Sequence, residues 1–144
     1  MPSESQATRG PERHTILVVD DDSDIRSLTR TFLEHEGYSV YTSGNADRAV
    51  HIFRRAPGID LVITDYSMPH RSGVDLAREL KSIRPSLPVL LISGIFLAPV
   101  QLAQMQAQGW SFLAKPFSLP LLLATVHNIL QPTRSSSASV TLGR

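Results

Sequence analysis

Polar residues suited to phosphate and metal chemistry stand at the ends of four apolar runs in this sequence. The runs and their polar ends are Thr15–Asp20 followed by Asp21 and Asp22, Leu61–Thr64 followed by Asp65, Val89–Ser93 ending in Ser93, and Phe112–Ala114 followed by Lys115. Taken alone, an aspartate triplet is more simply a solvated helix-capping loop, and a lysine before a proline is more simply a surface lysine. The four together predict one site.

The residue types indicate which chemistry such a site could perform. Several carboxylates held together repel one another unless a cation lies among them. Oxygen ligands alone suit Mg²⁺ or Mn²⁺, and zinc is disfavoured without histidine or cysteine nearby. A carboxylate can also act as a phosphoryl nucleophile and form an acyl phosphate. Lys115 could then neutralise charge on the transferring group, and the Ser93 hydroxyl could donate a hydrogen bond to the same oxygens.

The elements that must position these residues can be predicted from hydrophobic periodicity. Nearly continuous apolar runs at Thr15–Asp20, Leu61–Thr64 and Val89–Ser93 are typical of parallel strands covered on both faces. The more polar run Tyr38–Thr42 and the short run Phe112–Ala114 are typical of edge strands. Helix-period segments follow each strand. Their apolar stripes are Ile25, Leu28, Phe32 and Leu33; Ala46, Ala49, Val50 and Phe53; Val74, Ala77, Leu80 and Ile83; a weaker one over residues 98–108; and Leu119, Leu122, Leu123, Val126, Ile129 and Leu130.

The alternation of five strands and five helices predicts an α/β fold of the (βα)₅ type. Right-handed crossovers then lead to a doubly wound parallel sheet between two helical layers, a three-layer sandwich. Five strands favour the flavodoxin-like order 2-1-3-4-5, in which ligands bind beyond the carboxyl ends of the strands, between strands 1 and 3. All four polar strand ends would meet at that edge.

Composition limits the function classes. The chain has 144 residues, 42% hydrophobic and 19% charged, which fits one folded domain. Residues 1–14 read as a disordered leader and 132–144 as a flexible tail. A net charge of +1 gives no electrostatic case for binding DNA or a membrane surface. The chain has no cysteine, no signal-peptide pattern and no apolar run long enough for a bilayer, so we expect a cytoplasmic protein.

The stretches ILVVDDD, LVITDYSMP, PVLLISG and FLAKPF together resemble the receiver domain of two-component response regulators. The resemblance extends from about Thr15 to Leu130, so we expect a receiver domain over residues 15–131. It implies that Asp65 is the phosphoacceptor and that Phe112 is the switch aromatic. It also implies a cis Lys115–Pro116 bond, and contacts from Ser93 and Lys115 to the phosphoryl group. The implied Mg²⁺ ligands are Asp20, Asp21, Asp65 and the backbone carbonyl of Ser67.

The resemblance also implies the partners. A histidine kinase or histidine phosphotransfer protein would donate the phosphoryl group, and the protein would catalyse only its own phosphorylation and dephosphorylation. A downstream protein would bind the face formed by the fourth helix, the fifth strand and the fifth helix, where Leu121 lies off the apolar stripe. Only 14 residues follow Leu130 (144 − 130). We therefore expect a stand-alone receiver, or one excised from a hybrid histidine kinase or longer regulator.

Two alternatives belong to other functional classes. Asp20–Ser23 resembles the nucleophile motif of haloacid-dehalogenase-type phosphohydrolases, which are Mg²⁺-dependent. Those enzymes need acidic metal ligands downstream of their lysine, and no Asp or Glu follows Glu79. A receiver-like binding module without phosphorylation is the second alternative, but such proteins usually lack the acceptor, the acid pair or the lysine, all of which are present here.

Overall fold

The computed structural model describes residues 14–56, 58–94 and 97–131. Five strands and five helices alternate along these residues. They are β1 (Thr15–Val19), α1 (Ser23–His35), β2 (Ser39–Ser43), α2 (Ala46–Arg55), β3 (Ile59–Asp65), α3 (Gly73–Ile83), β4 (Val89–Ser93), α4 (Pro99–Ala107), β5 (Trp110–Ala114) and α5 (Leu119–Leu130). The predicted leader and tail lie outside the described residues, apart from His14, and stay predictions.

The five strands form one parallel sheet in the order β2-β1-β3-β4-β5, which confirms the predicted α/β fold. As predicted, the more polar run, β2, and the short run, β5, are the edge strands. The register aligns the carboxyl ends of the strands, because Val19 of β1 pairs with Thr64 of β3, and Ser93 of β4 pairs with Ala114 of β5. Residues that follow these strands therefore emerge at the same edge of the sheet.

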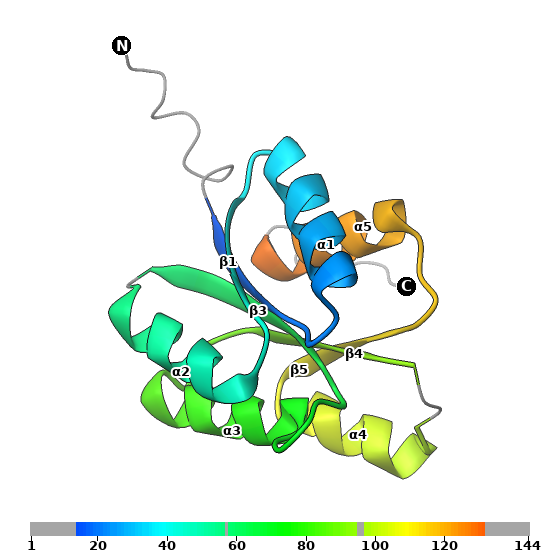
Figure 1. Cartoon of the computed structure of the whole chain (residues 1–144). Helices are drawn as coiled ribbons and strands as arrows, with labels where there is room; N and C mark the ends of the chain where they lie inside the picture. Colours follow the sequence, from blue (N-terminus) through cyan, green and yellow to red (C-terminus); the bar gives the residue numbers. More distant parts are fainter. Residues whose placement is uncertain (1–13, 57, 95–96, 132–144) are drawn as a thin grey trace.

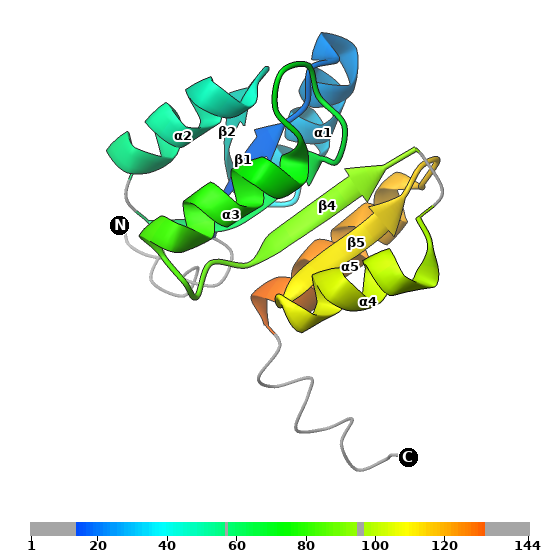
Figure 2. The same cartoon turned by 90° about the horizontal axis from the view of Figure 1, so that it is seen from below.

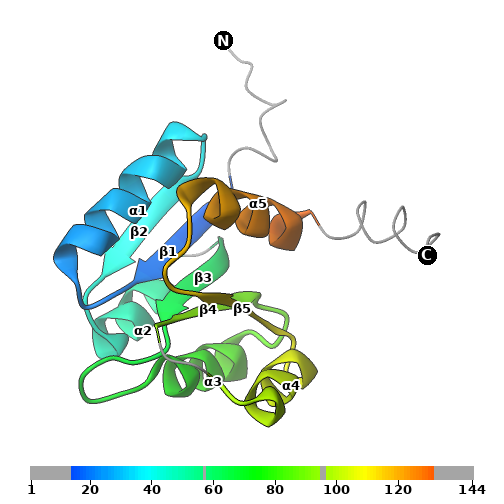
Figure 3. The ribbon, with the colours of Figure 1, turned by 90° about the vertical axis from the view of Figure 1, so that its right-hand side faces the viewer.

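A helical layer covers each face of the sheet, and each layer encloses its own hydrophobic core. Helices α1 and α5 lie on one face, and α2, α3 and α4 lie on the other (Figures 1 and 3). Alternate residues of one strand serve the two cores, as the period of a strand requires. In β1, Ile16 and Val18 pack under α1 and α5, whereas Leu17 and Val19 pack under the other three helices. The nearly continuous apolar runs are thus explained by burial on both faces.

Short polar side chains begin four of the five helices. The Asp22 carboxylate accepts hydrogen bonds from the first-turn N–H groups of α1, and Asn45, Ser72 and Ser118 do the same for α2, α3 and α5. Each cap satisfies a backbone donor that has no partner within its helix.

Two predictions from periodicity are wrong in detail. Strands β3 and β5 begin at Ile59 and Trp110, each two residues before the predicted Leu61 and Phe112. In α1 the predicted stripe is rotated, because Ile25 and Leu28 are 37% and 56% exposed while Thr29 and Leu33 are buried. The polar Thr29 therefore takes the buried position that Leu28 was expected to fill.

Candidate functional site

The polar strand ends predicted from sequence meet at the carboxyl edge of the sheet. Asp20 directly follows β1, Asp65 ends β3, Ser93 ends β4, and Lys115 directly follows β5. A backbone hydrogen bond of 2.8 Å from the Lys115 N–H to the Ser93 carbonyl holds the last two strand ends together. The sheet topology therefore collects residues that lie up to 95 positions apart (115 − 20) in the sequence.

Three carboxylates and one ammonium group form the centre of this arrangement. Asp20, Asp21 and Asp65 each offer an oxygen, and these oxygens all lie within 4.8 Å of one another. The Lys115 Nζ lies 3.7 Å from Oδ1 of Asp65 and 4.0 Å from Oδ2 of Asp20. Asp20 and Asp65 are largely buried, whereas Asp21 is exposed. The site thus opens to solvent on the Asp21 side.

The electrostatics of this cluster favour an added cation. Burial raises the pKa of the Asp65 carboxyl, and the nearby Asp20 and Asp21 raise it further, while the Lys115 ammonium opposes them. Burial also raises the pKa of Asp20, opposed first by the Asp22 backbone N–H and then by Lys115. The Lys115 ammonium alone thus does not offset the rise in carboxyl pKa that burial and mutual repulsion cause. A divalent cation would favour the ionised form of each carboxylate.

Backbone contacts hold Asp20 in place. Its N–H donates to the Ser43 carbonyl (3.1 Å), and its Oδ1 accepts from the Asp22 N–H (2.9 Å). Arg26, in the first half of α1, donates from Nη1 to the Asp20 carbonyl oxygen at 2.6 Å. This role of Arg26 was not predicted, because nothing in its immediate sequence distinguishes it from the chain's other arginines. Only its position could have indicated the contact, because a helical side chain six residues after Asp20 can reach back to the end of the strand.

The loop that follows Asp65 is closed tightly against the strand. The Tyr66 N–H donates to the Ile92 carbonyl (2.7 Å), and the Gly73 N–H donates to the Tyr66 carbonyl (2.8 Å). A Cβ atom on Gly73 would lie 2.0 Å from the Asp65 carbonyl oxygen, so only glycine allows this approach. This contact could not be predicted from the sequence.

Arg71 links the same loop to α2 and α3 through two ion pairs, a role that could not be predicted from the sequence. Its Nη1 lies 3.0 Å from Oδ1 of Asp47 in α2, and its Nη2 lies 2.5 Å from Oε1 of Glu79 in α3. His70, beside it, has a φ of 74°, in the left-handed region that non-glycine residues seldom occupy. The fork of Arg71 helps to hold the loop in that conformation.

The remaining predicted residues lie as follows. Ser67 is in the loop two residues after Asp65, with an exposed side chain. Ser93 is 2% exposed, and Phe112 of β5 is half-buried against the core under α2, α3 and α4. The Lys115–Pro116 bond is cis, as the resemblance implied.

The residues present fit Mg²⁺. The cluster offers only carboxylate oxygens, the hard ligands that this ion prefers, and one of the three carboxylates is exposed, which leaves room for the waters that Mg²⁺ usually keeps. No histidine or cysteine belongs to the cluster among the described residues, which disfavours zinc.

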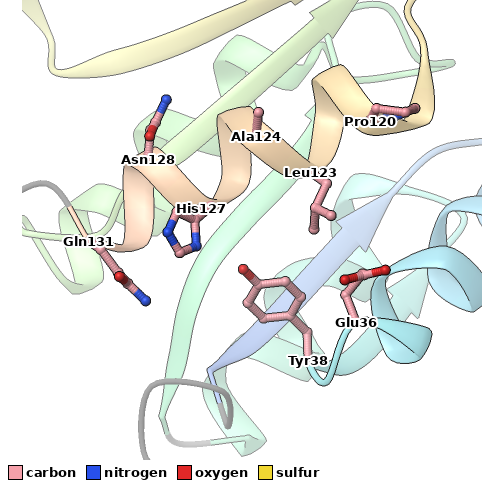
Figure 4. Close-up of a pocket in the computed structure, with 8 residues that line it drawn as sticks. All are labelled: Glu36, Tyr38, Pro120, Leu123, Ala124, His127, Asn128 and Gln131. Carbon is pink, nitrogen blue, oxygen red and sulfur yellow. The ribbon is translucent and has the colours of Figure 1, made fainter. Parts of the chain in front are cut away.

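A separate groove of about 500 Å³ lies between α5 and the segment that follows α1. Figure 4 shows Tyr38 and Glu36 facing Leu123 and His127 of α5 across it. None of the strand-end residues lines this groove, so it does not belong to the carboxylate site. No described helix is long and apolar enough to cross a membrane.

Comparison with known proteins agrees with this geometry. Residues 16–127 match the family model of the response regulator receiver domain. The chain is 32% identical over 119 residues to the probable transcriptional regulatory protein TcrX of Mycobacterium tuberculosis, covering 83% of this chain and 50% of that protein. It is 36% identical over 124 residues to the DNA-binding transcriptional regulator NtrC of Azospirillum brasilense, covering 86% of this chain and 26% of NtrC. The chain thus spans from a quarter to a half of the length of these relatives.

Solved structures resemble the fold over most of its length. A receiver domain protein from Clostridium thermocellum superposes with a TM-score of 0.77 at 31% identity, covering 84% of this chain and 97% of that one. The chemotaxis protein CheY4 of Vibrio cholerae superposes with a TM-score of 0.72 at 28% identity, covering 81% and 98%.

The chain belongs to the response regulator receiver domain family. It is a phosphoacceptor receiver of two-component signalling, the system in which histidine kinases are the partners of response regulators. Neither the phosphohydrolase alternative nor a receiver-like module without phosphorylation is favoured by these matches.

Proposed function

We propose that Asp65 is the residue that accepts the phosphoryl group. The observation that carries this assignment is the position of Lys115, whose Nζ lies 3.7 Å from the Asp65 carboxylate at the open edge of the sheet. Among the three clustered carboxylates, Asp65 ends the central strand β3, and Asp20 is held by the Asp22 N–H through one of its oxygens. An oxygen of Asp65 would attack phosphorus, the P–N bond of a phosphohistidine would break, and its electron pair would return to the imidazole.

The neighbouring residues would then act on the group being transferred. Lys115 would pair with the phosphoryl oxygens, and the Ser93 hydroxyl would donate to one of them. Mg²⁺, or Mn²⁺, would be held by Asp20, Asp21, Asp65 and the Ser67 backbone carbonyl, and it would neutralise charge on the phosphoryl oxygens. Catalysis would be limited to the protein's own phosphorylation and dephosphorylation.

The partners proposed from the sequence are consistent with the surface. The phosphodonor would be a histidine kinase or a histidine phosphotransfer protein in the cytoplasm. The downstream protein would bind the face of α4, β5 and α5, where Val100 is 62% and Leu121 is 49% exposed. Phe112 would act as the switch aromatic of this face. The described residues carry no helix beyond those that pack on the sheet, so we propose that they do not themselves bind DNA.

The test is phosphorylation by acetyl phosphate in Mg²⁺, followed by intact-mass measurement. Wild type should gain one phosphoryl group and Asp65→Asn none. Asp75→Asn is the matched control, because it makes the same chemical change at an exposed position in the first turn of α3 and should be labelled like wild type. Labelling that persists in Asp65→Asn would place the acceptor elsewhere.

A further inference from the structure

Arg26 places its guanidinium on the peptide bond that joins two of the clustered carboxylates. Its Nη1 donates to the Asp20 carbonyl oxygen at 2.6 Å. That oxygen belongs to the peptide unit between Asp20 and Asp21, and both of these side chains contribute to the carboxylate cluster. Within the part of the chain that the structure describes, no other group forms a hydrogen bond with this peptide unit. Arg26 thus makes the bond that can act on both carboxylates at once.

Neither an ion pair nor helix stability explains the position of this side chain. Four aspartates precede Arg26 within six residues of the sequence. The guanidinium nevertheless forms no ion pair with a carboxylate of the described residues. Arg26 is also the fourth residue of α1 (26 − 23 + 1), close to the helix end where the helix dipole disfavours a cation. The hydrogen bond to the Asp20 carbonyl is the contact that accounts for its place.

The loop after β2 holds the same guanidinium from a second side. A Cβ atom on Gly44, which directly follows β2, would lie 3.1 Å from Nη1 and 3.6 Å from Cζ of Arg26. The guanidinium therefore lies against the backbone of Gly44, and Arg26 is half-buried there. The Asp20 N–H donates to the Ser43 carbonyl at 3.1 Å, so the loops after β1 and β2 are joined twice. Figure 2 shows the arrowheads of β1 and β4 pointing toward this edge of the sheet.

Holding one peptide unit orients two side chains. The unit is planar, so the direction of its carbonyl is tied to ψ of Asp20 and φ of Asp21. These torsions set the directions in which the two Cβ atoms point. The cluster oxygens lie within 4.8 Å of one another although like charges repel. Mg²⁺ demands nearly ideal octahedral geometry, so its affinity depends on how well the carboxylates are held before it binds.

We propose that Arg26 is a positioning residue of the Mg²⁺ site, which orients Asp20 and Asp21 through the peptide unit between them. This role rests on the proposed Mg²⁺ site. Residues that orient metal ligands without touching the metal typically contribute about 10–100-fold to metal affinity. Charge alone predicts the opposite sign, because a guanidinium near the site repels a divalent cation, and its removal would strengthen binding.

The experiment measures Mg²⁺ affinity in the full chain without any phosphodonor. Mg²⁺ is added stepwise, and binding is followed by the NMR shifts of the Asp21 and Tyr66 backbone amides, which lie in the cluster and directly after Asp65. Arg26→Met removes the charge and the donor but keeps an unbranched side chain. We expect its Mg²⁺ affinity to fall about tenfold. Arg26→Lys keeps the charge and one donor, so its affinity should lie between those of Arg26→Met and wild type.

Arg30→Met is the matched control. It removes the same charge from α1 one turn further on, where Arg30 pairs with Glu34 at the surface, and it should bind Mg²⁺ like wild type. The Mg²⁺-free spectra separate a lost orientation from a general loss of structure. The Asp21 amide resonance should shift in Arg26→Met, because the carbonyl of its own peptide unit loses a hydrogen bond, and it should stay in place in Arg30→Met.

An Mg²⁺ affinity that is unchanged or higher in the folded Arg26→Met variant would overturn the positioning role. A fall of equal size in Arg30→Met would overturn it too, because loss of charge anywhere on α1 would then suffice. If wild type itself showed no saturable shift at Asp21 and Tyr66, the proposed Mg²⁺ site would be refuted and the role of Arg26 with it.

Discussion

The contact between Gly73 and the backbone of Asp65 allows a sharp test of how the loop positions the acceptor. In Gly73→Ala the new Cβ would lie 2.0 Å from the Asp65 carbonyl oxygen, so the two atoms must separate by about 1.4 Å (3.4 − 2.0) to reach ordinary contact. Movement of residue 73 away from the Asp65 carbonyl is hindered, because the same Cβ would lie 3.2 Å from Cδ2 of Leu91. The Asp65 end of β3 or the start of α3 must therefore move.

The expected magnitude follows from what that movement disrupts. Overpacking in a close-packed region costs about 1–3 kcal/mol. Loss of the hydrogen bond from the Gly73 N–H to the Tyr66 carbonyl costs about 1 kcal/mol more. The better helix propensity of alanine offsets about 1 kcal/mol. We expect the free energy of unfolding to fall by about 1–3 kcal/mol. A displacement of about 1 Å at the acceptor should slow phosphorylation about 100-fold.

The assay is urea unfolding together with the rate of phosphorylation by acetyl phosphate in saturating Mg²⁺. Gly94→Ala is the matched control, because its new Cβ would only make ordinary contacts of 3.8 and 3.9 Å with the Lys115 side chain. That variant should stay within about 0.5 kcal/mol of wild type. The reasoning is refuted if Gly73→Ala unfolds at the wild-type urea concentration and is phosphorylated at the wild-type rate.

Three further predictions concern the carboxylates, the loop and the signalling face. Because the pKa of Asp20 is raised in the folded state, its protonation stabilises the fold fully below the ordinary value of 3.8, and this contribution is lost as the pH rises through the raised pKa. Asp20→Asn should therefore raise the urea midpoint at pH 7 without Mg²⁺ and reduce the stabilisation that added Mg²⁺ gives; a lower midpoint contradicts this. Arg71→Met breaks two partly exposed ion pairs and should lower the free energy of unfolding by about 1 kcal/mol, measured by urea unfolding, whereas Arg55→Met should change it little; equal effects would remove the role of Arg71. Adding beryllofluoride, an analogue of the phosphoryl group, should change the NMR shifts of α4, β5 and α5, including those of Val100 and Leu121, and changes that avoid this face would exclude it as the signalling surface.

The sequence by itself determined the fold class and the edge of the sheet where the site lies. Nearly continuous apolar runs that alternate with helix-period segments indicated strands buried on both faces, and crossover handedness then left few topologies. The placement of Asp20, Asp65, Ser93 and Lys115 followed, because each stands where its strand ends. Local caps such as Asp22 and Asn45 were predictable for the same reason, since they depend on contacts within three residues.

Tertiary structure decided the features that join distant parts of the chain. Arg71 reaches Asp47 and Glu79 on two helices, and no periodicity distinguishes it from an exposed loop arginine. The rotation of α1 that exposes Leu28 depends on how the helix packs beside α5, because propensity and stripe counting describe a helix in isolation. The unpartnered indole of Trp110 could not be anticipated either, because a hydrogen bond that is missing becomes visible only when every neighbour is in place.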